Sequence, residues 1–217
     1  MIKPQDIVVL VKLISIEKMI IKYNDLYNDE YSFYYVNDSL YDSQKFFDFQ
    51  SITLLLSMRG LAESIHISKS ETAECIKRLY NIGLLTFKNQ KNGERIELSN
   101  LNWKVNKRAF FRLIINSFEF FFKTEPKAID IGIPTVFSNE SLKNHLAYSS
   151  PLPFIWPMAS YNAISGIALD PLHKSVPQAS MNDKYLYEIF SLIDVFRIGS
   201  PREKKIAQNL LEEDFYL

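Results

Sequence analysis

Cysteine and glycine are scarce in this sequence, with one cysteine and six glycines among 217 residues. A single thiol excludes an intramolecular disulfide and a zinc site made of several cysteines. The glycines are scattered, so the sequence has neither a glycine-rich phosphate loop nor a G-x-S-x-G nucleophile elbow. We expect the lone thiol, Cys75, to be a small core residue, with redox sensing as the alternative.

Histidine is also scarce. His66, His145 and His173 stand apart, and none lies in an H-x-x-x-H metal-binding motif. Asp170 and Ser175 are close to His173, but such clusters arise by chance in a proline-rich stretch. The sequence therefore predicts no enzymatic activity, no cofactor and no metal site.

The sequence also lacks a long apolar run without charged residues. The apolar stretch at residues 7–21 is interrupted by Lys12, Glu17 and Lys18, which makes it too short and too charged to span a bilayer. We therefore expect a cytoplasmic protein with no membrane contact.

The chain carries no net charge, which by itself argues against binding to nucleic acid. The charges are nevertheless segregated. Residues 51–124 hold 12 Lys and Arg against 6 Asp and Glu, a net of +6. Residues 1–50 hold 5 against 8 and residues 125–217 hold 8 against 11, a net of −3 in each case. The basic middle segment is therefore the candidate for contact with DNA, with an ordinary solvated face as the alternative.

Within this segment, residues 61–66 read as a short helix and a turn, and a second, well-delimited helix follows. Ser68 and Glu71 form an S-x-x-E capping box, which predicts a helix over about residues 69–80. Gly83 lies just past it and predicts its end. The apolar stripe of this helix consists of Thr72, Ile76 and Leu79.

A basic β-hairpin is predicted directly after this helix, over about residues 84–98. Residues 84–87 alternate as a strand, and Ile96 and Leu98 alternate on the return strand. Asn92–Gly93 between them is the strongest short-range hairpin signal. The basic residues that gather at the tip, where they suit phosphate or minor-groove contact, are Lys88, Lys91 and Arg95.

A helix, a turn, a capped helix and a hairpin in this order are what a winged helix-turn-helix needs. Such a fold places its second helix in the DNA major groove and the hairpin beside it. The alternative is a plain helix pair and hairpin in some other α+β domain. The predicted DNA-binding residues are Ser68, Lys69, Ser70, Ala73, Glu74, Lys77, Arg78, Lys88, Lys91 and Arg95.

Over residues 4–20 and 51–124 the chain resembles bacterial winged helix-turn-helix transcriptional regulators of the MarR-like type. The resemblance implies a homodimer that binds double-stranded DNA. It departs from the usual pattern at His66, because such turns usually carry glycine or another small residue. Histidine tolerates the left-handed conformation better than most residues, so the turn remains feasible.

The rest of the N-terminal part is predicted to brace this motif. A first helix opens at Pro4, and residues 51–65 form a second helix whose early part, residues 52–56, must be buried. Between them, residues 23–50 form an acidic aromatic insertion with six tyrosines and four phenylalanines, including a strand at residues 31–36. This insertion is either a surface loop packed on the domain or a contact surface for a partner protein.

The C-terminal part is predicted to be helical and rich in proline. Asn106 caps a helix over residues 107–123, whose apolar face either forms a dimer interface or packs on the chain's own C-terminal half. Seven of the nine prolines lie in residues 126–181 and predict extended, irregular structure there. Two closing helices follow, the first capped by Asp183 and the second opened by a capping box at residues 200–203.

Asp194 and Arg197 on the first of these helices are expected to form a structural salt bridge, or else to line a ligand pocket with His173. From Gly132 to Glu203 the chain resembles uncharacterised bacterial winged-helix proteins, and this resemblance implies a helical accessory domain.

The predicted fold class is mainly α with a small β-hairpin wing, an α+β fold. The predicted parts are a winged helix-turn-helix domain at 1–104, a connecting or dimerisation helix at 105–124, and a helical accessory domain at 125–217. The predicted function is a sequence-specific DNA-binding transcriptional regulator that acts as a homodimer. The alternative is an antitoxin-like or adaptor module that binds a partner protein through the winged fold and residues 23–50.

Overall fold

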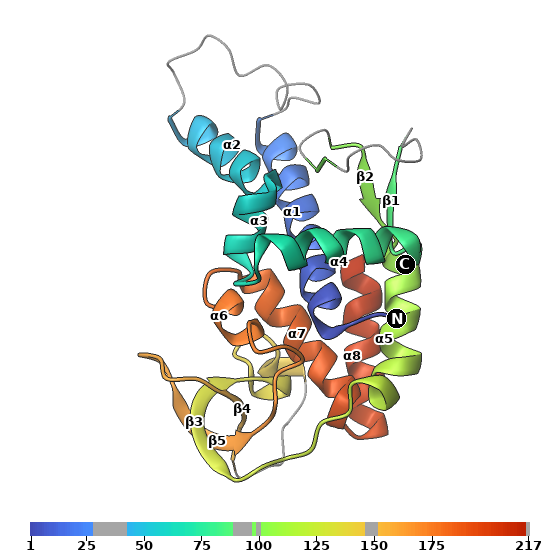
Figure 1. The fold of residues 1–217 in the computed structure, drawn as a ribbon. Helices are drawn as coiled ribbons and strands as arrows, with labels where there is room; N and C mark the ends of the chain where they lie inside the picture. Colours follow the sequence, from blue (N-terminus) through green and yellow to red (C-terminus); the bar gives the residue numbers. More distant parts are fainter. Residues whose placement is uncertain (28–42, 89–96, 99–100, 146–151, 216–217) are drawn as a thin grey trace. The chain divides into compact units, whose positions relative to one another are not determined.

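The computed structural model describes residues 1–27, 43–88, 97–98, 101–145 and 152–215. These residues are mainly helical, with one two-stranded and one three-stranded sheet, so the chain has an α+β fold (Figure 1). The chain divides into two compact units, Met1–Val105 and Asn106–Leu217. None of the described helices is long and apolar enough to cross a membrane.

The first unit begins with helix α1, Pro4–Tyr27. Proline suits the first turn of a helix, where an N–H group has no partner within the helix. Asp6 in that turn accepts a hydrogen bond from the backbone N–H of Lys3, at 2.8 Å. The first half of α1 is almost wholly buried, from Asp6 to Ile16. The predicted opening of this helix at Pro4 is therefore confirmed.

The helix predicted at residues 51–65 is in fact two helices, α2 (Ser43–Leu56) and α3 (Met58–Ser64). Ser57 separates the two helices because its hydroxyl forms a hydrogen bond with the backbone of each of them. The Ser57 Oγ accepts from the backbone N–H of Gly60 at 2.9 Å, as the N-cap of α3. The same hydroxyl donates to the carbonyl of Leu54 at 2.7 Å. These bonds satisfy backbone groups that a continuous helix would have paired.

The predicted insertion at residues 23–50 also changes, because α1 extends to Tyr27 and α2 already begins at Ser43. The predicted strand at 31–36 lies outside the described residues. On α2, Ile52 and Leu56 are buried, but Leu54 between them is 63% exposed. The prediction that all of residues 52–56 are buried is therefore wrong, since a helix can turn only one side toward the core.

Helix α4, Lys69–Asn81, is followed by the antiparallel pair β1 (Leu85–Phe87) and β2 (Trp103–Val105). Leu98, the described residue of the predicted return strand, lies in no strand, and β1 pairs with β2 instead. Ile96, the other residue of that prediction, lies outside the described residues. The backbone N–H of Lys88 extends the pairing with a 2.6 Å bond to the carbonyl of Asn102.

Burial explains this register. Leu85 lies opposite Val105 and Phe87 opposite Trp103, so three buried side chains and a half-buried one share the inner face. The indole of Trp103 donates to the carbonyl of Leu98 at 2.9 Å, which anchors the residues before β2. The predicted Asn92–Gly93 turn lies outside the described residues.

The second unit begins with helix α5, Lys107–Phe121, capped as predicted by the Asn106 side chain, which accepts from the Ala109 N–H at 3.0 Å. The apolar side of α5 packs on α7 (Lys184–Ile198) and α8 (Pro201–Phe215). Packing on the chain's own C-terminal part is therefore the alternative that the structure shows, and a dimer contact of α5 stays a prediction.

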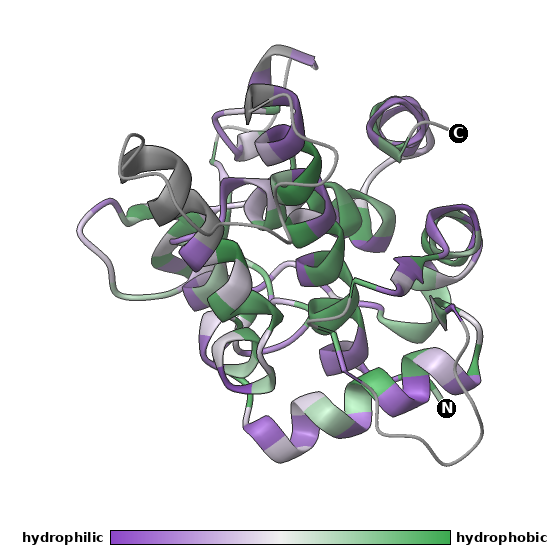
Figure 2. Cartoon of the chain, turned by 90° about the horizontal axis from the view of Figure 1, so that it is seen from above, coloured by the Kyte–Doolittle hydropathy of each residue, from purple (hydrophilic) through white to green (hydrophobic). Residues whose placement is uncertain are grey.

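Helices α7 and α8 have the caps that the sequence predicts. The Asp183 carboxylate accepts from the Leu186 N–H at 2.9 Å. The capping box of α8 is reciprocal: the Glu203 N–H donates to Ser200 Oγ at 3.4 Å, and the Ser200 N–H donates to the Glu203 carboxylate at 2.7 Å. Green hydrophobic and purple hydrophilic positions alternate along the helices in Figure 2, as expected for helices with one buried side.

The proline-rich region is more regular than predicted, because it contains strands β3 (Ile129–Pro134), β4 (Phe154–Pro157) and β5 (Ile164–Ala168). Strand β3 runs antiparallel to both others, β4 and β5 are parallel, and the three strands close on one another. The short helical pieces of this region are η2 (Val136–Ser138), η3 (Lys143–His145) and α6 (Val176–Ser180). The predicted helical accessory domain is therefore a mixed α+β unit.

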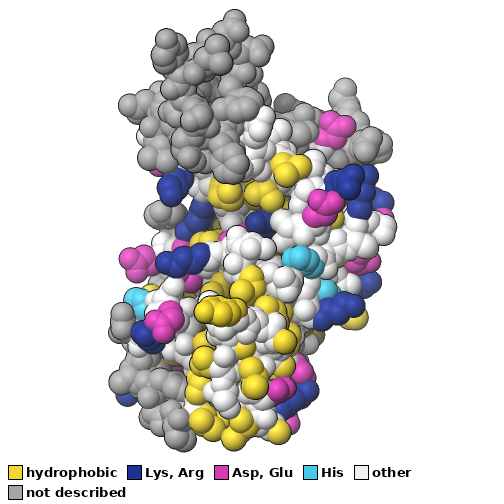
Figure 3. Space-filling view, turned by 90° about the vertical axis from the view of Figure 1, so that its left-hand side faces the viewer, with side chains coloured by type: hydrophobic (Ala, Val, Ile, Leu, Met, Phe, Trp, Pro, Cys, Tyr) yellow, Lys and Arg dark blue, Asp and Glu magenta, His cyan; other side chains and the backbone are white. Residues whose placement is uncertain are grey.

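Hydrophobic side chains gather on the surface of this sheet (Figure 3). Ile129, Ile131 and Ile164 are 62%, 60% and 41% exposed.

The predicted salt bridge between Asp194 and Arg197 is confirmed as a buried structural pair, at 2.6 Å, with both side chains at most 4% exposed. Asp194 also accepts from Trp156 Nε1 at 2.6 Å and from Thr135 Oγ1 at 2.9 Å. Burial raises the pKa of Asp194, and the pairing with Arg197 opposes that shift. The side chain of His173 instead contacts Ser175, at 2.9 Å.

Candidate nucleic-acid interface

Helix α4 is sharply delimited at both ends, as the sequence predicts. Ser68 is its N-cap, and its hydroxyl accepts from the Glu71 N–H at 3.3 Å. At the other end Gly83 has a φ of 73°. The Gly83 N–H donates to the carbonyl of Tyr80, and the Leu84 N–H donates to that of Leu79, both at 3.0 Å. These are the two bonds of a Schellman motif, which requires the left-handed conformation that glycine adopts without strain.

The two sides of α4 differ as predicted. Thr72, Ile76 and Leu79 are buried, which confirms the predicted stripe. The opposite side is open, and we call it the α4 outer face. Its members are the exposed Lys69, Ser70, Glu74 and Lys77 and the half-exposed Ala73.

Two charged residues of the α4 outer face are paired with each other. The Lys77 ammonium donates to the Glu74 carboxylate at 2.7 Å, three residues apart on the helix. The two side chains are 60% and 52% exposed, so both remain accessible to an incoming molecule. A pair this exposed adds little to stability.

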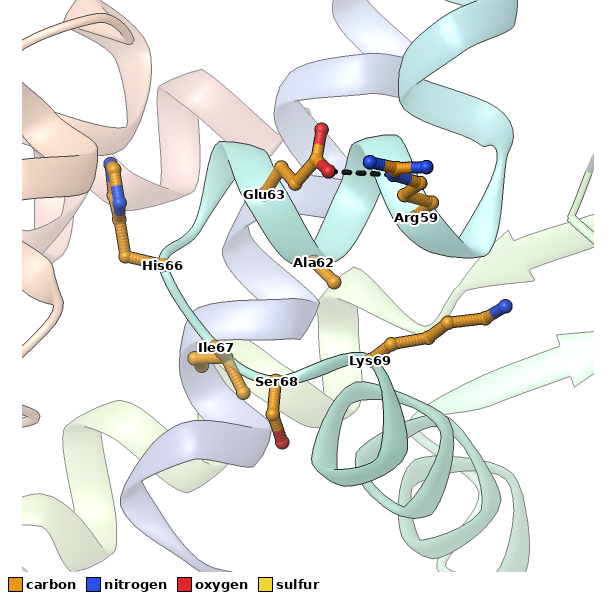
Figure 4. Close-up of a pocket in the computed structure, with 7 residues that line it drawn as sticks. All are labelled: Arg59, Ala62, Glu63, His66, Ile67, Ser68 and Lys69. Carbon is orange, nitrogen blue, oxygen red and sulfur yellow. Dashed lines mark hydrogen bonds and ion pairs between the residues drawn. The ribbon is translucent and has the colours of Figure 1, made fainter.

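The turn between α3 and α4 forms a hollow of about 720 Å³. His66 in this turn has a φ of 54°, so histidine takes the left-handed conformation that the sequence requires of this position. In Figure 4 the Lys69 side chain extends away from His66, and Arg59 on α3 pairs with Glu63 at 2.8 Å. The residues that line the hollow are Arg59, Ala62, Glu63, His66, Ile67, Ser68 and Lys69.

The prediction that Arg78 contacts DNA is corrected, because its guanidinium forms hydrogen bonds within the first unit. Its Nε lies 3.0 and 3.1 Å from the two carboxylate oxygens of Asp6, and its NH2 group lies 2.7 Å from one of them. Asp6 is completely buried and Arg78 is 22% exposed. These hydrogen bonds raise the pKa of Arg78 further. Arg78 therefore fastens α4 to the start of α1.

Glu71 and Cys75 complete this network on the inner side of α4. In place of the predicted bond back to Ser68, the Glu71 carboxylate accepts from Arg78 at 2.6 Å and from Gln5 at 3.1 Å. The bond from Arg78 holds the pKa of Glu71 below its usual value. Cys75 is buried as predicted, and burial raises the pKa of its thiol, which disfavours the reactive thiolate.

The strands after α4 contribute two exposed lysines, Lys88 at the end of β1 and Lys104 on β2. Lys104 lies opposite Thr86 in the strand pair. Lys91 and Arg95, the other predicted hairpin contacts, lie outside the described residues.

Sequence reasoning counted Lys104 among the basic residues of the middle segment but did not include it among the predicted DNA contacts, and it did not single out Arg59. Arg59 follows the helix start at Ser57, and the spacing Arg59–Glu63, one helical turn, is a signal that the sequence does contain.

No family model, no curated protein and no solved structure matches this chain. The resemblance to MarR-like regulators therefore stays a prediction. The function must be argued from the geometry of the chain itself.

Proposed function

We propose that this protein is a sequence-specific DNA-binding transcriptional regulator with a winged helix-turn-helix unit, and that it acts as a homodimer. The observation that carries the proposal is the α4 outer face. It is an open polar helix face that directly follows a tight turn and directly precedes an antiparallel strand pair. This is the order of elements in which a recognition helix and a wing occur.

The dimensions of α4 fit the task. Its 13 residues make a rod of about 20 Å, at 1.5 Å per residue. A helix of this kind fits the major groove of B-DNA, which is about 12 Å wide. Its buried side is occupied by the stripe and by Arg78, so the α4 outer face is the side that is left to meet base edges.

Phosphate contacts would come from the lysines at the borders of this face. Lys69 stands at the N-terminal end of α4, where unpaired backbone N–H groups also favour an anion. Lys88 and Lys104 belong to the strand pair that takes the place of the wing. Each phosphate that such a lysine neutralises makes binding more sensitive to salt.

The test is a selection of double-stranded DNA from a randomised pool, followed by binding measurements at several salt concentrations. We expect a defined site, and we expect Lys69→Glu to weaken binding to every sequence and to flatten the salt slope by about one. Lys205→Glu on α8 is the control, because Lys205 is also exposed but lies in the second unit. The proposal is wrong if the selection recovers no preferred sequence, or if the Lys69 and Lys205 variants bind DNA with equal affinity.

One observation favours the adaptor as a second candidate function. Leu54 is exposed on α2, close to the segment predicted to contact a partner protein. Replacing residues 28–42 by a short Gly-Ser linker separates the two candidates, because α1 and α2 remain whole. A regulator keeps its DNA affinity after this change, whereas an adaptor loses its partner in a pull-down.

A further inference from the structure

Glu74 is out of place on a surface that faces DNA. It is the only acidic member of the α4 outer face, and its side chain is 52% exposed. DNA carries one negative charge per roughly 1.7 Å of helix axis, so a carboxylate at this position weakens binding to most sequences. The cost is offset where the carboxylate meets a hydrogen-bond donor on a base edge.

Lys77 determines what kind of base edge this can be. Its ammonium lies 2.7 Å from the Glu74 carboxylate, so an acceptor and a donor stand side by side on the helix. Neither group has a structural task in the core, since both point away from the buried stripe. The pair therefore presents an acceptor next to a donor to the groove.

We propose that the Glu74–Lys77 pair reads one C·G base pair in the major groove. Cytosine offers its N4 amino group to the Glu74 carboxylate, and the guanine of the same base pair offers O6 and N7 to Lys77. These base groups are themselves neighbours, because N4 and O6 pair across the Watson–Crick edge. Glu74 is thus the residue that determines specificity, and the inference rests on the proposed function.

The other base pairs match the pattern less well. In an A·T pair the N6 donor lies between two acceptors, adenine N7 and thymine O4, and both repel a carboxylate. Thymine in addition carries a methyl group at the groove edge, which offers nothing to a charged side chain. The Glu74 carboxylate therefore selects against A·T as much as it selects for C·G.

The experiment compares the sites selected from a randomised duplex pool by the wild-type chain, by Glu74→Ala and by Glu74→Gln. We expect one C·G position in the wild-type site, with a loss of roughly ten- to a hundredfold in affinity when it is replaced by A·T. Glu74→Ala weakens the preference at that position alone, where the Lys77 contact to guanine remains, and raises affinity for unrelated DNA. Glu74→Gln moves the preference there to adenine, because glutamine pairs with adenine N6 and N7.

The matched control is Glu213→Gln, which removes one exposed negative charge from α8 in the second unit and leaves the site unchanged. Thermal unfolding of each variant confirms that the fold is kept. If the wild-type chain selects a site and Glu74→Ala shows the same strength of preference at every position of that site, the inference is wrong and the proposed function stands. If the wild-type chain selects no site at all, both are wrong.

Discussion

The Arg78–Asp6 pair should dominate the stability of the first unit. Arg78→Met leaves the completely buried Asp6 carboxylate without the guanidinium that donates to both of its oxygens. Breaking a buried ion pair by removing one partner costs about 3–5 kcal/mol, because an uncompensated charge stays in the core. A domain of this size is stable by only about 5–15 kcal/mol, so the loss is large. We expect the urea midpoint of the first unit to fall accordingly.

A double-mutant cycle separates this charge effect from lost packing. In an Asp6→Asn background the same Arg78→Met change should cost much less, with a coupling of roughly 2 kcal/mol between the two sites. Arg59→Met is the control: Arg59 is paired with Glu63, but both side chains are more than 60% exposed. The urea midpoint of this control should stay at the wild-type value, because an exposed ion pair adds little to stability. A loss below about 1 kcal/mol for Arg78→Met, or two additive changes in the cycle, would refute the reasoning.

Two further predictions concern the same helix. The pKa of Glu71 is lowered in the folded state, chiefly by the hydrogen bond from Arg78. Its ionised form therefore adds stability above the unfolded pKa, about 4.3, and this contribution is lost as the pH falls through the folded pKa. Between pH 6 and pH 3, the free energy of unfolding should fall less with decreasing pH for Glu71→Gln than for the wild-type chain. Parallel plots of the free energy of unfolding against pH would contradict this. Gly83→Ala should cost about 1 kcal/mol through backbone strain alone, since φ is 73° and an added Cβ meets no atom within 4 Å. Chemical denaturation measures this loss, and an unchanged midpoint would show that the left-handed conformation is not needed there.

Helix ends were the most predictable part of the fold. Ser68, Asn106 and Asp183 each cap a helix at the predicted residue. A cap depends on a side chain and a backbone group three residues apart, so a short stretch of sequence contains all the information. The same is true of Gly83, whose conformation is fixed by the two hydrogen bonds of the turn that it closes.

Pairings between distant residues were not predictable in the same way. Arg78 was assigned to DNA because its partner Asp6 lies 72 positions earlier in the chain. Strand β2 was missed because apolar residues also alternate in the nearer stretch at Ile96 and Leu98. Pairing of β1 with β2 is the arrangement that buries Trp103. In the second unit the strands are short and surrounded by prolines, so periodicity is too brief to identify them.

On the candidate interface, the sequence predicted which residues of α4 are exposed, since a 3.6-residue period fixes the polar side once the apolar stripe is known. It did not predict that Glu74 and Lys77 bond to each other. Two side chains three positions apart on a helix are neighbours, but which rotamers they choose depends on the surface around them.

The closed sheet of the second unit has a consequence for how this protein behaves at high concentration. Exposed isoleucines on an open sheet edge invite another chain to add a strand, which is a common start of aggregation. Here β3, β4 and β5 each pair with the other two. Ile129 and Ile131, however, pair with β5 alone, because β4 pairs only with residues 132–134 of β3. The exposed isoleucines therefore lie on the part of β3 that has a strand on one side, and we expect association at high concentration to begin there.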